Sequence, residues 1–326
     1  MKTVGLLISH KNGEKRRALL PSDIKKIKNP GNLYFEKGYA ASLNIEDREY
    51  QELGCNMVSR EEALKKDILI DVKLGDADYI ESLEKGKILF GWAHAVQSLD
   101  FTTAVLKGKH TVFAWEDLYE DGRYIFYKNR EIAGEAAILH AIPMMGFMPY
   151  EARFAILGNG KTSKGVQRIL YGLGAKEVDV FGRRLEKLFR KEMFKYDVIV
   201  NCVLWDTNRT DRLIYKEDLK KFKKGTFIVD VSCDPNLEIE TSHPTTIENP
   251  IYEIDGVIHY AVDNTPALFS KTVSQVLSPR IAELINELVD DNIGEMLEKT
   301  RVIDKGRVIL KDIKKFRDAK GLPSEY

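Results

Sequence analysis

Cysteine is scarce in this sequence, and its three copies stand far apart, at positions 55, 202 and 233. They form no C-x-x-C pair, and an odd number cannot all pair with one another. We therefore expect neither a disulfide framework nor a bound metal. So little cysteine is typical of a protein from a reducing compartment.

Net charge is missing too, since 50 lysine and arginine residues balance 50 aspartate and glutamate residues. A net charge of zero argues against a nucleic-acid surface or a basic membrane-binding face. No apolar run reaches the about 18 residues of a transmembrane helix, and the apolar stretch after Met1 is too short for a signal peptide. We expect a soluble cytoplasmic protein with neither nucleic acid nor membrane as a partner.

What the sequence does have is an alternation of short apolar runs with helical stretches. Its 326 residues, 44% of them hydrophobic, suggest about two domains with sizeable cores. The runs that predict strands are 4–8, 66–72, 88–90, 111–115, 154–157, 178–181, 196–203, 226–231 and 257–262. Segments 132–142 and 268–288 predict helices, the second with a kink or restart at Pro279. The alternation predicts an α/β fold with parallel sheets and right-handed crossovers.

The most informative stretch is a glycine pair between a strand and a helix. Ile156 and Leu157 lead into Gly158 and Gly160, and Ser163 stands at the third position of the dinucleotide-binding fingerprint. Glycines at these points let the backbone turn tightly and approach a pyrophosphate at the positive end of the next helix. A strand, turn and helix that bind no nucleotide would show similar glycines.

The end of the following strand indicates which dinucleotide is bound. An acidic residue usually stands there, about 20 residues after the glycines, to take the ribose hydroxyls of NAD. Here Gly182 occupies that point, and Arg183 and Arg184 follow it. A guanidinium can bind a 2′-phosphate that a carboxylate would repel, so the segment predicts NADPH, with Val203 also in the cofactor site. The alternative for the two arginines is an ordinary solvated turn.

Four polar residues follow predicted strands, where an α/β sheet places its chemistry. They are Arg16, Lys73, His94 and Asp234. Together they suit reduction of a 2-oxo acid or its imine, because one cation can hold the carboxylate, another can polarise the carbonyl and the imidazole can move protons. Taken singly, each also fits an ordinary role, as a solvated charge within the cluster Lys15, Arg16 and Arg17, as a loop residue, or as a satisfied polar group beside Trp92.

These segments, in this order, resemble the alanine dehydrogenase and transhydrogenase family. In that family an E-x-R-x-A-x-x-P segment, a V-K, an apolar run ending in His and an Asp after a nucleotide-domain strand line one cleft. The resemblance runs from about residue 3 to 285, and Ser242 to Thr246 and Val262 to Pro266 belong to it. It implies two Rossmann-like, doubly wound domains with a cleft between them. We expect a discontinuous catalytic domain, residues 1–133 and 272–326, and an NADP-binding domain, residues 134–271.

Within the family, Trp115 to Arg123 and Glu131 to Ala137 are similar to the branch that reductively condenses pyruvate with the side-chain amine of L-ornithine, or less readily lysine. That likeness implies catalytic roles for His94, Lys73 and Asp234, and substrate binding by Arg16 and Lys73. Glu116, Asp206 and Asp263 are candidates for the amino-acid head group, with ordinary loop carboxylates as the alternative. The family also implies a homo-oligomer, a dimer or tetramer. An alanine or saccharopine dehydrogenase, or an NADP-sensing protein without activity, would share the fold.

Overall fold

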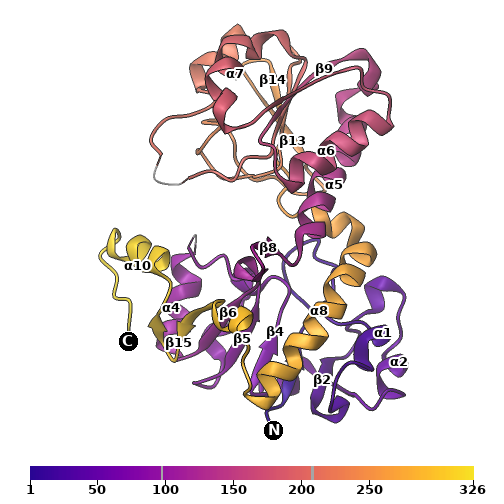
Figure 1. Ribbon diagram of the computed structural model, residues 1–326, viewed down its shortest axis with the longest axis vertical. Helices are drawn as coiled ribbons and strands as arrows, with labels where there is room; N and C mark the ends of the chain where they lie inside the picture. Colours follow the sequence, from indigo (N-terminus) through magenta and orange to yellow (C-terminus); the bar gives the residue numbers. More distant parts are fainter. Residues whose placement is uncertain (97, 207–208) are drawn as a thin grey trace. The chain divides into compact units, whose positions relative to one another are not determined.

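The computed structural model describes residues 1–96, 98–206 and 209–326. It divides into a first unit, Met1–Phe126 with Ser270–Tyr326, and a second unit, Tyr127–Phe269. The expected division at 133/134 and 271/272 falls inside two helices, α5 (Tyr127–Met145) and α8 (Ser270–Asp290), whereas the units divide just before each of them. The second unit is thus a contiguous segment inserted into the first (Figure 1).

The sheet of the first unit runs in the order β16-β15-β6-β5-β4-β1-β2-β3. Its strands are β1 (Val4–Leu6), β2 (Leu33–Glu36), β3 (Asn56–Val58), β4 (Ile68–Ile70), β5 (Ile88–Gly91), β6 (Thr111–Ala114), β15 (Arg301–Asp304) and β16 (Arg307–Val308). The strands from β3 to β6 are parallel, and β15 and β16 add an antiparallel edge. The order reverses between β1 and β4, and such a switch point is where doubly wound sheets bind ligands.

The helices of the first unit come from both its amino-terminal and its carboxy-terminal segment. They are α1 (Pro21–Ile24), α2 (Asp47–Gln51), α3 (Arg60–Leu64), α4 (Leu99–Lys107), α8, α9 (Glu295–Glu298) and α10 (Lys311–Asp318). Figure 1 shows α8, in orange, beside the indigo segment that carries α1. The Oγ atoms of Ser274 and Ser278 on α8 accept hydrogen bonds from the backbone N–H groups of Arg17 and Leu20, both at 2.8 Å. The returning helix therefore fixes the loop that carries Arg16. It continues through Pro279, so of the two alternatives that we predicted there, a kink or a restart, the restart is wrong.

The sheet of the second unit runs in the order β10-β9-β11-β12-β14-β13. Its strands are β9 (Arg153–Leu157), β10 (Glu177–Phe181), β11 (Val198–Asn201), β12 (Phe227–Asp230), β13 (Ile251–Ile254) and β14 (Val257–Tyr260), with helices α5, α6 (Lys161–Gly172) and α7 (Glu186–Glu192). Phe154 and Ile156 of β9 enter one core, and Ala155 and Leu157 enter the other. Burial on both faces explains why this strand is a continuous apolar run. The order reverses between β9 and β11, beside the glycine pair.

The polar segment 116–130 contains a short antiparallel hairpin, formed by β7 (Tyr119–Glu120) and β8 (Arg123–Tyr124).

In residues 1–96, 98–206 and 209–326 we find no helix with both the length and the apolar character needed to cross a membrane.

Candidate active site

Arg16 lies in the loop that follows β1 at the switch point of the first unit. Although it stands in a basic cluster, only 2% of it is exposed, and Glu14 holds it. Its Nε donates to Glu14 Oε1 at 2.9 Å, its Nη2 to Oε2 at 2.5 Å and its backbone N–H to Oε1 at 2.8 Å. The guanidinium carbon lies 4.8 Å from the centre of a Trp92 ring. Arg16 is therefore a rigidly placed buried cation rather than a solvated charge.

Lys73 follows β4 on the other side of the switch point, and a buried aspartate holds its backbone. Asp71 Oδ1 accepts the Lys73 N–H at 2.9 Å, and Asp71 Oδ2 accepts the Tyr79 hydroxyl at 3.2 Å. Burial raises the pKa of Asp71 to about 6. The Lys73 ammonium lies 3.8 Å from Asp76 Oδ2, and the residue is 7% exposed. A desolvated lysine next to carboxylates can both bind an anion and take part in proton transfer.

His94 follows β5 and has the left-handed φ of +43°, which is rare outside glycine. Glu116 supports this turn, because its Oε2 accepts the N–H of Ala93 at 3.1 Å and its Oε1 accepts the N–H of His94 at 2.6 Å. Burial raises the pKa of Glu116 to about 7. Both oxygens of Glu116 are thus engaged by the backbone, which favours a role in shaping the His94 turn over a role in holding a substrate head group.

The loops that follow β4 and β5 touch backbone to backbone. The N–H of Gly75 donates to Trp92 O at 2.9 Å, and a Cβ added at Gly75 would lie 2.2 Å from Ala93 O. A Cβ added at Gly91 would lie 2.0 Å from Asp71 O. Only glycine permits this approach. It brings the Lys73 and His94 loops together beside Trp92, whose ring also meets Arg16, so three of the four polar residues belong to adjoining loops of one unit.

The glycine pair occupies the switch point of the second unit. Gly158 has a φ of +91°, and a Cβ there would lie 2.8 Å from Cys202 O, so this strand end packs on the residue before Val203. Gly160 is the N-cap of α6 and has no side-chain cap, and a Cβ there would meet no atom within 4 Å. Ser163 is fully buried, and its hydroxyl accepts a hydrogen bond from Gln167 Nε2 at 3.0 Å. An uncapped helix start beside open space suits a phosphate.

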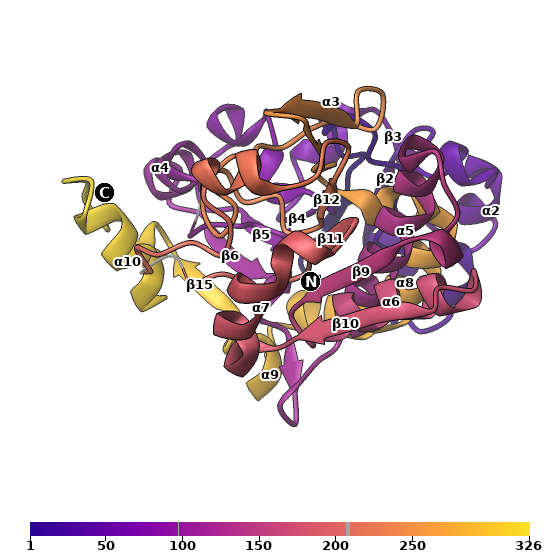
Figure 2. The same ribbon diagram turned by 90° about the horizontal axis from the view of Figure 1, so that it is seen from above.

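The close packing in this unit comes from two other glycines. A Cβ at Gly134 of α5 would lie 2.1 Å from Thr162 O, and one at Gly165 of α6 would lie 2.0 Å from Glu131 O. These helices run side by side in both views (Figures 1 and 2). The start of α6 is therefore set by direct contact with the backbone of α5.

Arg183 and Arg184 follow β10 and are both exposed. Among residues 1–96, 98–206 and 209–326, neither side chain has a hydrogen bond or an ion pair. The nearest following carboxylate, Glu186, is engaged by Arg209, with distances of 3.1 and 2.9 Å from Nη1 and Nη2 to its two oxygens. Two unpaired cations thus stand where a dinucleotide-binding sheet usually places its ribose-binding acid.

Asp234 follows β12 in a turn where Cys233 has a φ of +59°. Burial raises the pKa of Asp234 to about 6, and the charges of Asp230 and Asp263 add to the shift. Asp230 is itself buried, and its Oδ1 accepts the N–H groups of Ser232 and Cys233, both at 3.1 Å. Asp206, the third head-group candidate, accepts the N–H of Arg209 on its backbone oxygen at 2.9 Å.

At all four polar residues a carboxylate accepts hydrogen bonds from backbone N–H groups of the same loop or turn. Arg16, Lys73 and His94 each donate the backbone N–H to a partly or wholly buried carboxylate, namely Glu14, Asp71 and Glu116. Before Asp234 it is the turn that is held, because Asp230 accepts the N–H groups of Ser232 and Cys233. Past the end of a strand the ladder no longer pairs these N–H groups, so another acceptor is required. From the sequence we gave Glu14 no role beyond its place in the E-x-R-x-A-x-x-P motif, and we did not single out Asp71 or Asp230. The sequence feature that could have indicated them is an acidic residue shortly before each candidate. It stands two residues before Arg16 and Lys73, as in an Asx-type turn, and four residues before Asp234.

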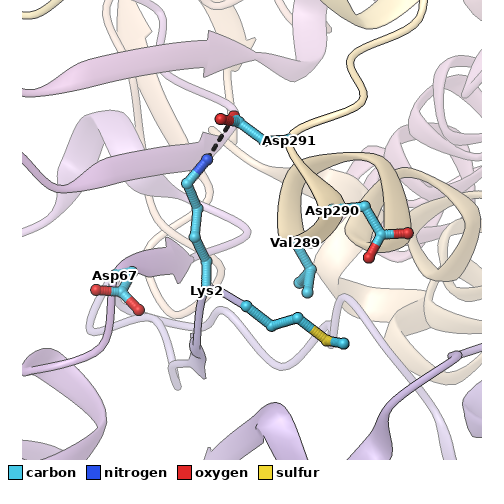
Figure 3. A pocket seen from close by; sticks show the side chains of 6 residues that line it. Lys2, Asp67, Val289, Asp290 and Asp291 are labelled. Carbon is cyan, nitrogen blue, oxygen red and sulfur yellow. Dashed lines mark hydrogen bonds and ion pairs between the residues drawn. The ribbon is translucent and has the colours of Figure 1, made fainter.

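An open hollow of about 530 Å³ lies elsewhere in the first unit, lined by Met1, Lys2, Asp67, Val289, Asp290 and Asp291 (Figure 3). Lys2 and Asp67 precede β1 and β4, so the hollow is at the amino ends of the strands, opposite the edge that carries Arg16 and Lys73. Its acidic residues have partners: Asp291 pairs with Lys2 at 2.5 Å, Asp290 with Lys28 at 2.6 Å, and Asp67 accepts the N–H of Thr3 at 2.7 Å. In the part of the chain that the structure describes, no group of His, Cys, Asp and Glu could hold a metal ion.

Two protein-family models match the chain. "Alanine dehydrogenase/PNT, N-terminal domain" matches residues 7–126, and "Alanine dehydrogenase/PNT, C-terminal domain" matches residues 144–314.

Curated relatives cover nearly the whole chain. N(5)-(carboxyethyl)ornithine synthase of Lactococcus lactis subsp. lactis is 33% identical over 298 residues, 86% of this chain and 95% of the relative. The protein of that name from Clostridium botulinum is 30% identical over 316 residues, 90% of this chain and 98% of the relative. Alanine dehydrogenase 1 of Staphylococcus aureus is 23% identical over 335 residues, 91% of this chain and 90% of the relative.

Solved structures share the architecture. An L-alanine dehydrogenase has a TM-score of 0.82 at 20% identity and covers 97% of this chain and 99% of its own. A transhydrogenase from Sinorhizobium meliloti has a TM-score of 0.76 at 18% identity, with 94% and 99% covered. The prediction of an α/β fold with two Rossmann-like domains is confirmed.

Proposed function

Because the chain belongs to the alanine dehydrogenase/PNT family, we propose that this oxidoreductase uses NADPH to condense pyruvate reductively with the side-chain amine of L-ornithine. The observation that carries the proposal is the likeness to proteins named N(5)-(carboxyethyl)ornithine synthase, at 30–33% identity over most of both chains. The likeness to an alanine dehydrogenase is lower, at 23%. The product would be a secondary amine with two carboxylates.

The second unit fits a nicotinamide dinucleotide. The uncapped start of α6 offers backbone N–H groups to the pyrophosphate, Gly158 lets the chain turn tightly before it, and Val203 follows the neighbouring strand β11. Arg183 and Arg184 supply two unpaired guanidinium groups for a 2′-phosphate, which supports NADPH over NADH. When bound, the cofactor would supply the hydride that reduces the carbon–nitrogen double bond.

The first unit supplies groups for the 2-oxo acid. Arg16, held by Glu14, would bind the pyruvate carboxylate, and Lys73 would assist it or polarise the ketone. His94 would donate a proton to the hydroxyl of the carbinolamine, so that it leaves as water. The left-handed turn that Glu116 supports fixes the direction from which the imidazole reaches the substrate.

We assign to Asp234, in the second unit, the role of a catalytic carboxyl. The amine must lose its proton before it attacks the ketone, so the reaction requires a base or a high working pH. A carboxyl whose pKa is raised to about 6 takes up protons closer to neutral pH than an ordinary aspartate does. Asp263, whose charge acts on Asp234, is the carboxylate that we assign to the cationic end of ornithine.

The proposal is tested by following NADPH oxidation with pyruvate and ornithine, lysine or ammonia in turn, with mass spectrometry of the product. Ornithine should be the best amine. One methylene separates it from lysine and is worth only about 1–3 kcal/mol, so lysine should retain some activity. If ammonia reacts fastest and gives alanine, the protein is an alanine dehydrogenase. If lysine reacts only with a larger 2-oxo acid, it is of the saccharopine dehydrogenase type, and NADPH binding without any turnover would indicate a sensing protein.

A further inference from the structure

A buried asparagine joins two buried carboxylates at the end of the sheet in the second unit. Nδ2 of Asn201 donates to Asp230 Oδ1 at 2.8 Å and to Glu238 Oε1 at 2.6 Å. All three residues are 1% exposed or less. Both hydrogens of the amide are therefore used, and its carbonyl oxygen remains as an acceptor.

That carbonyl oxygen holds one of the two turns expected in the active site. Asn201 Oδ1 accepts the N–H of Val203 at 3.2 Å. The hydroxyl of Ser232 donates to Val203 O at 2.5 Å, which ties the same turn to the segment that follows β12.

Asp230 holds the other turn. Its Oδ1 accepts the N–H groups of Ser232 and Cys233, both at 3.1 Å, in addition to Asn201. Its Oδ2 accepts the hydroxyl of Ser242, which comes from the loop between β12 and β13. The Asp230 carboxylate thus accepts hydrogen bonds from four donors in three segments. Asp234 directly follows the turn that it holds.

We propose that Asp230 is a positioning residue of the reaction, which with Asn201 and Glu238 fixes the Val203 turn toward the cofactor and the Asp234 turn toward the substrate. We call these three residues the polar hub. The inference rests on the proposed function in one respect, the assignment of Val203 and Asp234 to the active site. Asp230 acts through the backbone and is not itself a catalytic residue.

The hub also adds negative charge beside Asp234. The titratable groups that interact with the charge of Asp230 or Asp234 are Glu238, Asp263, the thiols of Cys202 and Cys233 and the hydroxyl of Tyr252. The charges of Asp230 and Asp263 raise the pKa of Asp234. Glu238 Oε2 is buried and finds no hydrogen-bond partner among the described residues. Burial and the Asp230 charge raise the pKa of Glu238 to about 7, so this carboxyl gives up its proton only near neutral pH.

Two substitutions separate the acceptor role of Asp230 from its charge. Asp230→Ala removes every acceptor, whereas Asp230→Asn keeps one oxygen for the N–H groups of Ser232 and Cys233 and loses the charge. The matched pair is Asp218→Ala and Asp218→Asn. Asp218 is also buried in this unit, at 2% exposed, but it accepts the N–H of Tyr215 at 3.0 Å and an Arg190 guanidinium.

The first measurement is the Kd of whichever of NADPH and NADH the wild type binds more tightly. Hydrogen bonds to a charged acceptor are strong, so we expect Asp230→Ala to weaken binding about tenfold or more and Asp230→Asn to stay within about threefold of wild type. Both Asp218 variants should retain the wild-type Kd. Equal weakening by Asp230→Ala and Asp218→Ala, or by Asp230→Ala and Asp230→Asn, would overturn the positioning role.

The second measurement is the pH profile of kcat/KM with the substrate pair that the wild type uses best. Asp230→Asn removes a like charge, so the limb that Asp234 contributes should move to lower pH by about one unit, while Asp218→Asn leaves it in place. An unmoved limb in Asp230→Asn would overturn the electrostatic part of the hub. If ornithine proves not to be the amine, the proposed function fails, but the Kd comparison still decides on the hub.

Discussion

At the scale of single residues, the two arginines that follow β10 differ from the arginines elsewhere in the chain that pair with carboxylates. Arg16, Arg190 and Arg209 all pair with carboxylates in the structure, while Arg183 and Arg184 are exposed and unpaired among the described residues. Two like charges next to one another repel, so an arrangement of this kind gains most from an anion that binds both.

We predict that Arg183→Ala combined with Arg184→Ala weakens NADPH binding by about 10- to 100-fold and leaves NADH nearly unchanged. A charge-assisted contact is worth about 1.5–3 kcal/mol, and only NADPH has the 2′-phosphate to make it. The measurement is the Kd for each dinucleotide. The control, Lys187→Ala with Lys191→Ala, removes the same charge from exposed positions of α7. Equal losses for both dinucleotides would contradict a 2′-phosphate site.

The support of His94 by Glu116 gives a second residue-scale prediction. Glu116→Gln keeps one acceptor oxygen and replaces the other by a donor, so one of the two backbone bonds is lost. We expect kcat to fall by about tenfold or more with little change in the pyruvate KM, because proton transfer by a misdirected imidazole is impaired.

The matched control is Asp117→Asn, at the next carboxylate along the chain, which should keep near-wild-type kcat. The NADPH Kd should be unchanged in both variants. A fall in kcat that is shared equally by the two variants would show that the effect does not pass through His94.

At the scale of elements, the contact between α5 and α6 sets the position of the uncapped helix start. We predict that Gly165→Ala destabilises the protein and weakens NADPH binding, because the new Cβ would lie 2.0 Å from Glu131 O and the helices must separate. Gly172→Ala, in the same helix, meets no atom within 4 Å and should stabilise by up to about 1 kcal/mol through helix propensity.

The two glycine variants are compared by urea unfolding and by NADPH titration. If Gly165→Ala binds NADPH as tightly as Gly172→Ala does, the helix contact does not position the cofactor site.

The elements that sequence predicted well are the buried strands. The runs at 68–70, 88–91, 111–114 and 198–201 are strands with almost wholly buried side chains, so hydrophobicity alone marks them. Most of the strands that sequence missed lie at or next to the edge of a sheet, and the short strand β2, which pairs with both β1 and β3, was missed as well. In β13 exposed and half-buried residues alternate, and β15 begins and ends in charged residues, Arg301 and Asp304. Such strands are held by backbone pairing, which leaves no apolar run to detect.

The supporting role of Glu14, Asp71 and Asp230 was missed for a different reason. Near the loops of Arg16 and Lys73, an acidic residue looks like an ordinary surface charge, and its burial follows only when strands distant in sequence come together. The close approaches at Gly75 and Gly91 depend on which loops become neighbours, and this depends on the strand order.

At the scale of the whole molecule, the buried carboxyl of Glu238 makes stability depend on pH. Its pKa is about 7 when folded and 4.5 ordinarily, so the folded state binds the proton more tightly than the unfolded state does. This contribution is fully present below about pH 4.5 and is lost as the pH rises to about 7.

We predict that Glu238→Gln abolishes the loss of stability that comes from this carboxyl. From pH 5 to pH 8, the free energy of unfolding of the variant should fall by about 2–3 kcal/mol less than that of the wild type. Urea unfolding at the two pH values measures it. Exposed Glu253→Gln, in the same unit, should show no such difference from the wild type, and an equal difference there would refute the assignment.

The insertion of the second unit into the first has a consequence for synthesis on the ribosome. Residues 1–126 are translated first, yet β15, which pairs with the edge of β6, and Ser274 and Ser278, which accept from Arg17 and Leu20, follow only after residues 127–269. The inserted unit is contiguous and can close as soon as it emerges. The nascent amino-terminal segment must wait with the backbone of β6 unpaired along one side, so we expect it to depend on protection from aggregation until the last 57 residues arrive.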